Sequence, residues 1–139
     1  MMEKTALFSS ISAVFGIFST MLGGWDNALS TLCVFMLLDY LTGLIVGGVF
    51  KKSSKTKTGA LESKAGLKGI FRKCSMLMVV LVAAQLDAFV GTSLLKDCTV
   101  IMFICNESLS LLENIGLMGV PIPQKLIDAI DVLTQKEGK

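Results

Sequence analysis

Residues 28–50, ALSTLCVFMLLDYLTGLIVGGVF, decide the fold of this chain. A helix needs about 20 predominantly apolar residues to cross the hydrocarbon core of a bilayer, and this stretch supplies them. One carboxylate, Asp39, interrupts the stretch near its middle. A charge at that depth is costly, so it normally faces protein or water instead of lipid. The stretch therefore predicts a membrane-spanning helix with one polar position turned away from lipid.

The composition of the whole chain agrees with a membrane protein. The 139 residues are 53% hydrophobic, against about 45–50% in ordinary soluble domains. A chain of this length has no room for a separate soluble enzyme domain. We therefore expect a single domain over residues 1–139.

Three further stretches are long and apolar enough to span. The four candidate spans are residues 5–24, 28–50, 70–91 and 94–117, and polar residues interrupt the fourth. The first span fits a signal peptide poorly, because a small-x-small cleavage site is missing and the apolar run is too long. Residues 124–139 have the apolar spacing of one helical face. The expected fold class is an all-α integral membrane protein with three to four transmembrane helices and a short amphipathic C-terminal helix.

The C-terminal helix has two possible settings, the membrane surface or a neighbouring helix. A frayed, solvent-exposed tail is the alternative, because the segment is near the lower length limit for an isolated helix. Before it, Pro121 and Pro123 prevent continuation of the fourth span. The turn between the two helices is therefore expected close to Gly119.

Basic residues gather in the linker 51–69 and at the entrance to the third span. Basic residues accumulate in short cytoplasmic loops, so this linker is expected in the cytoplasm, and four spans then place both termini there too. Such residues also attract anionic headgroups, although a topology signal alone is an equally good explanation. They are Lys51, Lys52, Lys55, Lys57, Lys64, Lys68, Arg72 and Lys73.

Small residues recur every four positions on the spans. Helices in lipid associate through close backbone approach and buried polar contacts, so such stripes predict helix packing, including packing between copies of the chain. Asp39 shares its helix face with a GxxxG pair, and Asp87 shares one with Gly91. The packing residues are Ser12, Gly16, Thr20, Gly43, Gly47 and Gly91.

The acids inside the predicted spans have no Lys or Arg well inside those spans to pair with. A buried, unpaired carboxylate tends to take up a proton and donate a hydrogen bond, or else it must reach water. We expect the polar residues to line a subunit interface or an opening pathway. For Asp39 and Asp87 a hydrogen bond within one chain is the alternative, and for Glu113 a position near the headgroups. The full set is Asp39, Asp87, Asn106, Glu107, Ser110, Glu113 and Asn114.

Other chemistry has little support in the sequence. The chain contains no histidine, the commonest metal ligand and general base. Its four cysteines lack a CxxC spacing, and no phosphate-binding loop or nucleophile constellation is present. We therefore expect no enzymatic activity, no catalytic residue, no cofactor, no metal site and no nucleic-acid partner.

Three motifs occur in a fixed order: DYLTG at 39–43, SKAGLKGIFRK at 63–73 and NESLSLLENIGLMGVPIP at 106–123. This order resembles the toxin-secretion and phage-lysis holin family, over about residues 38–126. The matching positions are Asp39, Gly43, Gly66, Gly69, Arg72, Lys73, Asp87, Glu107, Ser108, Ser110, Asn114, Gly119, Pro121 and Pro123.

The resemblance implies a protein that forms homo-oligomers in the bacterial inner membrane and opens lesions there. Such lesions release an endolysin or a large toxin without specific binding to it, and anionic lipids are the other expected partner. A small ion-coupled or multidrug transporter is the main rival, because an intramembrane carboxylate can bind a proton or cation. The one-sided charge disfavours the antiparallel dimers of small multidrug transporters. An accessory helix bundle that recruits another membrane protein is the second rival.

Overall fold

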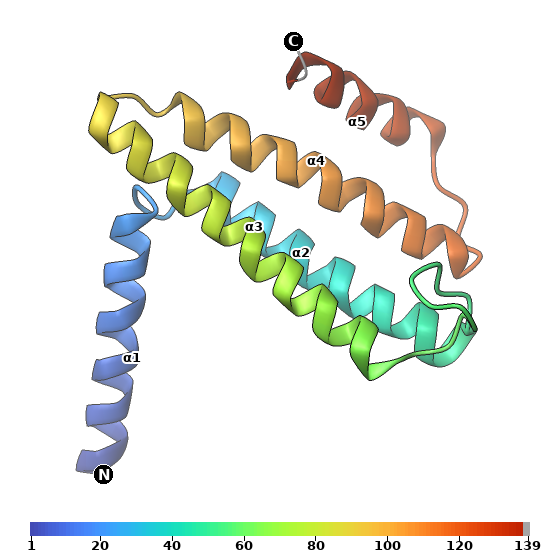
Figure 1. The fold of residues 1–139 in the computed structure, drawn as a ribbon, viewed down its shortest axis with the longest axis horizontal. Coiled ribbons are helices and arrows are strands. Elements are labelled where there is room, and N and C mark those ends of the chain that lie inside the picture. Colours follow the sequence, from blue (N-terminus) through green and yellow to red (C-terminus); the bar gives the residue numbers. More distant parts are fainter. Residues whose placement is uncertain (138–139) are drawn as a thin grey trace.

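The computed structural model describes residues 1–137, and helices make up most of that part of the chain (Figure 1). A π-helical turn, η1, continues the second helix, and the C-terminal helix follows a short proline-containing turn. The elements are α1 (Met2–Met21), α2 (Asn27–Ile45), η1 (Val46–Phe50), α3 (Ser63–Val90), α4 (Leu94–Leu117) and α5 (Gln124–Glu137). The expected all-α fold class is confirmed.

Three helices, α2, α3 and α4, run up and down beside one another and form the body of the molecule (Figure 1). Their facing sides enclose one apolar core cluster, while most other large apolar side chains are exposed. The cluster contains Leu22, Leu29, Leu32, Met36, Met76, Val80 and Val100. Exposed apolar side chains of this kind suit a protein embedded in a bilayer, because lipid hydrocarbon and not water contacts the outer faces of the helices.

Four helices are long and apolar enough to cross a membrane: α1, α2 with η1, α3 and α4. The third begins at Ser63, before the expected start at residue 70, so the linker comprises residues 51–62. The 28 residues of α3 span about 42 Å, which exceeds the hydrocarbon thickness. Its first turns, with the exposed Lys64 and Lys68, therefore extend toward the headgroups.

Helix α1 projects away from this body and buries none of its residues in the chain (Figure 1). Its end is attached through Leu22, which is fully buried, and through the Gln85 side chain, which donates to the Met21 carbonyl at 2.6 Å. Ser12, Gly16 and Thr20 are exposed, and no described residue of another element lies within 4 Å of a Cβ added at Gly16. Their expected role in helix packing is a prediction about contacts outside this chain.

Two glycines end helices in the left-handed conformation that glycine adopts most easily. Gly91 has a φ of +85° and lies beyond the last residue of α3. It was expected on a packing face, but within the described part of the chain nothing except its sequence neighbours lies within 4 Å of its Cβ position. Gly119 has a φ of +90° and opens the turn to Pro121 and Pro123, after which α5 folds back along α4.

Helix α5 lies on a neighbouring helix, one of the two settings expected for it. Ile130 is its buried anchor, with 8% of its surface exposed. Thr134 and residues of α4, including Met102 and Cys105, line a groove between the two helices. The last two residues of the expected tail, 138–139, lie outside the described residues.

Candidate functional site

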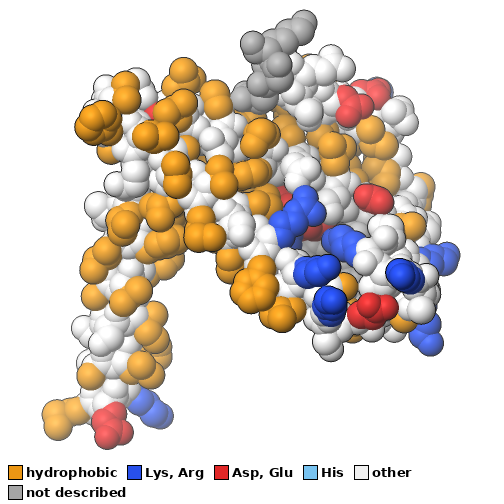
Figure 2. All heavy atoms as spheres, in the orientation of Figure 1, with side chains coloured by type: hydrophobic (Ala, Val, Ile, Leu, Met, Phe, Trp, Pro, Cys, Tyr) orange, Lys and Arg blue, Asp and Glu red, His pale blue; other side chains and the backbone are white. Residues whose placement is uncertain are grey.

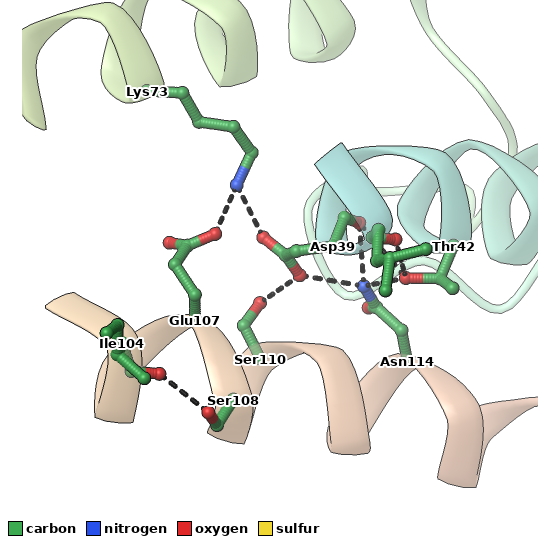
Figure 3. A network of polar contacts seen from close by, with 9 residues as sticks. Asp39, Thr42, Lys73, Ile104, Glu107, Ser108, Ser110 and Asn114 are labelled. Carbon is green, nitrogen blue, oxygen red and sulfur yellow. Dashed lines mark hydrogen bonds and ion pairs between the residues drawn. The ribbon is translucent and has the colours of Figure 1, made fainter. Parts of the chain in front are cut away.

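An ionic cluster joins the three body helices near their middles (Figure 3). The Lys73 ammonium of α3 lies 2.7 Å from the Asp39 carboxylate of α2 and 2.5 Å from the Glu107 carboxylate of α4. Asp39 and Glu107 are only 3% and 2% exposed. Each helix therefore contributes one charge to a cluster hidden inside the body.

Polar side chains of α4 complete the coordination of Asp39. The Ser110 hydroxyl donates to Asp39 Oδ1 at 2.6 Å. The Asn114 amide donates to the same oxygen at 3.0 Å and to the Asp39 carbonyl at 3.1 Å. Glu107, Ser110 and Asn114 are spaced three and four residues apart, so they share one face of the helix. The structure thus brings together Asp39, Glu107, Ser110 and Asn114 from the predicted set.

Asn106 and Glu113 do not join this cluster. Both are exposed on α4, and Asn106 lines the groove under α5 instead. The predicted polar face of the fourth span therefore divides. One side faces the interior, and the other faces the surroundings.

The expectation that these acids lack a cation is wrong for Asp39 and Glu107. Lys73 was assigned to the entrance of the third span. The helix α3 begins at Ser63, ten residues before Lys73, so Lys73 lies inside the body. Every buried side-chain nitrogen and oxygen of the described residues has a hydrogen-bond partner. A single chain thus satisfies its own buried polar groups.

Asp87 has a separate role at the opposite end of the body. Its carboxylate accepts the backbone N–H of Leu95 at 3.0 Å and that of Lys96 at 2.7 Å, and the Thr92 hydroxyl at 2.7 Å. These contacts cap the first turn of α4 from the end of α3. Asp87 therefore closes a helical hairpin within the chain, as in the alternative of a hydrogen bond within one chain.

Lys96 was not among the predicted site residues, yet it is buried and ties two connections together. Its ammonium donates to the Gly24 carbonyl at 3.1 Å and lies 3.5 Å from the Asp26 carboxylate. Asp26 in turn caps α2 by accepting the Leu29 N–H at 2.8 Å. One feature of the sequence could have indicated this role. Lys96 is the single basic residue in the two short connections, 24–27 and 91–97, that lie opposite the basic linker.

The glycines of the motifs are used for close packing inside the chain. A Cβ at Gly47 would lie 3.2 Å from the Leu61 Cα, and one at Gly66 or Gly69 would lie 3.4 Å from the Tyr40 ring or hydroxyl. The Tyr40 hydroxyl also donates to the Gly66 carbonyl at 3.3 Å. The GxxxG face of α2 therefore receives the returning linker and Asn114, whose amide would lie 3.8 Å from a Cβ at Gly43.

The basic residues divide into two groups. Lys55, Arg72 and Lys73 line a small cavity between the linker, α2 and α3. Lys55 and Arg72 are exposed at the cavity, and so are all the other basic residues of this region; basic side chains gather over this end of the molecule (Figure 2). The second group comprises Lys51, Lys52, Lys57, Lys64 and Lys68.

An all-helical body closed by a buried ionic cluster, with four helices suited to spanning a bilayer, defines a small polytopic membrane protein. Residues 16–135 match the model of the bacteriophage holin family. The chain belongs to this family.

The chain is also similar to proteins of bacteria and of a bacteriophage. A 14.9 kDa protein of Clostridium perfringens, described as uncharacterized, is 42% identical over 123 residues, which cover 87% of each chain. A protein of Bacillus phage phi105 named a probable holin is 32% identical over 106 residues, covering 76% of this chain and 73% of its own. Comparison with solved structures gave no match.

Proposed function

We propose that this protein is a phage-type holin. It oligomerises in the bacterial inner membrane with both termini in the cytoplasm, and the assembly opens lesions that release an endolysin or a large toxin. The observation that carries the mechanism is the Asp39–Lys73–Glu107 cluster, buried near the middle of three helices. In a protein whose assembly later admits water, these charged side chains stay paired with one another until the helices separate.

In the closed state the polar groups are satisfied within one chain, so the outer faces of the body are compatible with lipid. The unpartnered surface of α1, with Ser12, Gly16 and Thr20 along one stripe, supplies contacts between copies. Close packing along such stripes excludes lipid from between the helices. Accumulation of the protein therefore brings helix bodies into contact before any opening occurs.

Opening requires α2, α3 and α4 to separate around the cluster. Water then replaces the contacts that Asp39, Glu107 and Lys73 make with one another, and the charged side chains face an aqueous lesion. A switch of this kind needs two packings that differ by only a few kcal/mol. The cost of separating the buried charges delays opening until contacts between copies offset it.

Timed lysis with Asp39→Asn and Asp87→Asn, expressed separately at equal membrane levels, tests the proposal. We expect Asp39→Asn to shift the lysis time because it weakens the attachment of Lys73, whereas Asp87→Asn acts through the α3–α4 turn. Unchanged timing in both variants would remove these residues from the mechanism. Growth arrest and passage of a folded cytoplasmic endolysin identify a holin, whereas substrate-dependent proton flux without killing would identify a transporter.

A further inference from the structure

We propose that the cavity between the linker, α2 and α3 binds the phosphate of an anionic phospholipid. The cavity has a volume of about 60 Å³. That is room for several water molecules, so one phosphate group fits but a whole lipid does not. The proposal rests on the membrane topology given under the proposed function.

Two cations that face this cavity have no partner of their own. Lys73 is held by Asp39 and Glu107, but among the described residues neither the Lys55 ammonium nor the Arg72 guanidinium makes a hydrogen bond or ion pair. The Lys55 ammonium turns inward over α2, 3.9 Å from the position of a Cβ at Gly43. Glu62 also lines the cavity, so outside the Asp39–Lys73 pair its lining carries two cations and one carboxylate, and an anion offsets the remaining positive charge. Arginine in particular matches the geometry of phosphate oxygens.

The linker that carries Lys55 holds a defined shape. The Ser53 N–H donates to the Gly59 carbonyl at 2.9 Å, and the Thr56 hydroxyl donates to the Ala60 carbonyl at 2.8 Å. Gly59 has a φ of +76° and passes so close to the Lys51 carbonyl that no side chain fits there. These contacts place Lys55 at the cavity before any ligand arrives, which lowers the entropic cost of binding.

An adjoining groove favours a lipid over free phosphate. It shares Tyr40, Leu44 and Leu61 with the cavity and continues along Leu67 and Ile70 of α3. Leu61, Leu67 and Ile70 are all exposed. A headgroup phosphate in the cavity would thus leave its acyl chains beside apolar side chains. Basic pockets between transmembrane helices on the cytoplasmic side are known to take anionic headgroups.

The test compares the full-length protein with a site variant, Lys55→Gln with Arg72→Gln, and a matched variant, Lys57→Gln with Lys68→Gln. Both variants lose two basic charges at the same end, but Lys57 and Lys68 do not line the cavity. Binding of short-chain phosphatidylglycerol, phosphatidylcholine of the same chain length and inorganic phosphate is titrated in a neutral detergent. Thermal unfolding checks that both variants fold.

We expect the site variant to bind phosphatidylglycerol about 25-fold more weakly, about fivefold for each charge removed. The matched variant should stay within about threefold of the unchanged protein, and phosphatidylcholine should bind weakly to all three. An equal loss in both variants would overturn the proposal, because it would indicate diffuse attraction. Inorganic phosphate binding as tightly as the lipid, with the same dependence on Lys55 and Arg72, would overturn the lipid assignment. Failure here leaves timed lysis by the unchanged protein unaffected, so the two proposals fail separately.

Discussion

The Lys73 ammonium of α3 lies 2.7 Å from the Asp39 carboxylate of α2, and the same ammonium reaches Glu107 of α4. One lysine therefore holds together three helices that have little hydrophobic reason to associate in lipid. Two carboxylates share a single cation, so loss of that cation has a larger effect than loss of either acid.

Replacing Lys73 by Met is expected to destabilise the body by about 3–5 kcal/mol, because it leaves two buried carboxylates without a cation. Thermal unfolding in detergent measures the loss. Lys68→Met, at an exposed position on the same helix, is the control and should change stability little. Equal stability of the two variants would contradict the importance of the cluster.

The triple variant Lys73→Met, Asp39→Asn and Glu107→Gln should recover much of this stability. It removes all three charges together, and replacing a whole buried ionic group is often neutral where breaking it is not. The same unfolding measurement applies. A triple variant less stable than Lys73→Met would show that the ions themselves, and not their balance, stabilise the body.

Two glycine variants should change stability in opposite directions. At Gly47 an added Cβ would lie 3.2 Å from the Leu61 Cα and force the linker to move, at a cost of about 1–3 kcal/mol. At Gly16, within α1, nothing lies within 4 Å, so alanine should stabilise that helix by about 0.5–1 kcal/mol. Helix content and unfolding in one detergent check both, and similar losses would refute the packing assigned to Gly47.

Asp87→Ala should loosen the start of α4 by about 0.5–2 kcal/mol, the range for loss of a helix cap. Its carboxylate accepts the N–H groups of Leu95 and Lys96, so hydrogen exchange at these two amides should accelerate. Asp97→Ala, at an exposed acid in the same turn, is the matched control. Unchanged exchange at both amides in Asp87→Ala would exclude the capping role.

Ile130→Asp should release α5 from α4, because it places a charge at the buried anchor of the helix. Cys105, which is 4% exposed and lines the groove under α5, should then react faster with a maleimide, as measured by peptide mapping. Val132→Asp changes an exposed position of the same helix and should leave Cys105 protected. Equal protection in both variants would mean that α5 does not cover Cys105.

Apolar run length and turn residues were enough to predict the helix order and most boundaries. The length of the apolar run predicted the start of α3 at the wrong residue. Residues 63–69 are helical but polar on one side, and their other side packs against Tyr40. That error hid the position of Lys73 inside the body. Partners 34 residues apart in sequence, such as Lys73 and Asp39, depend on helix register across the bundle, which a single sequence does not provide.

The contact partners of Asp87 and Gly47 were not predicted, for a different reason. Both lie on small-residue stripes that are typical of helix interfaces, and helix spacing alone gives no contact partner. Asp87 meets the first turn of α4 only because Gly91 turns the chain sharply. Gly47 meets Leu61 only because the linker folds back over α2.

Because α1 packs so little against the rest of the chain, its sequence can vary more freely than that of the other helices. Because none of its side chains is buried in the chain, exchanges among apolar residues there leave the three-helix body intact. Under the proposed function, the segment is constrained by lipid and by neighbouring copies. The family match covers residues 16–135 and so leaves out most of this helix.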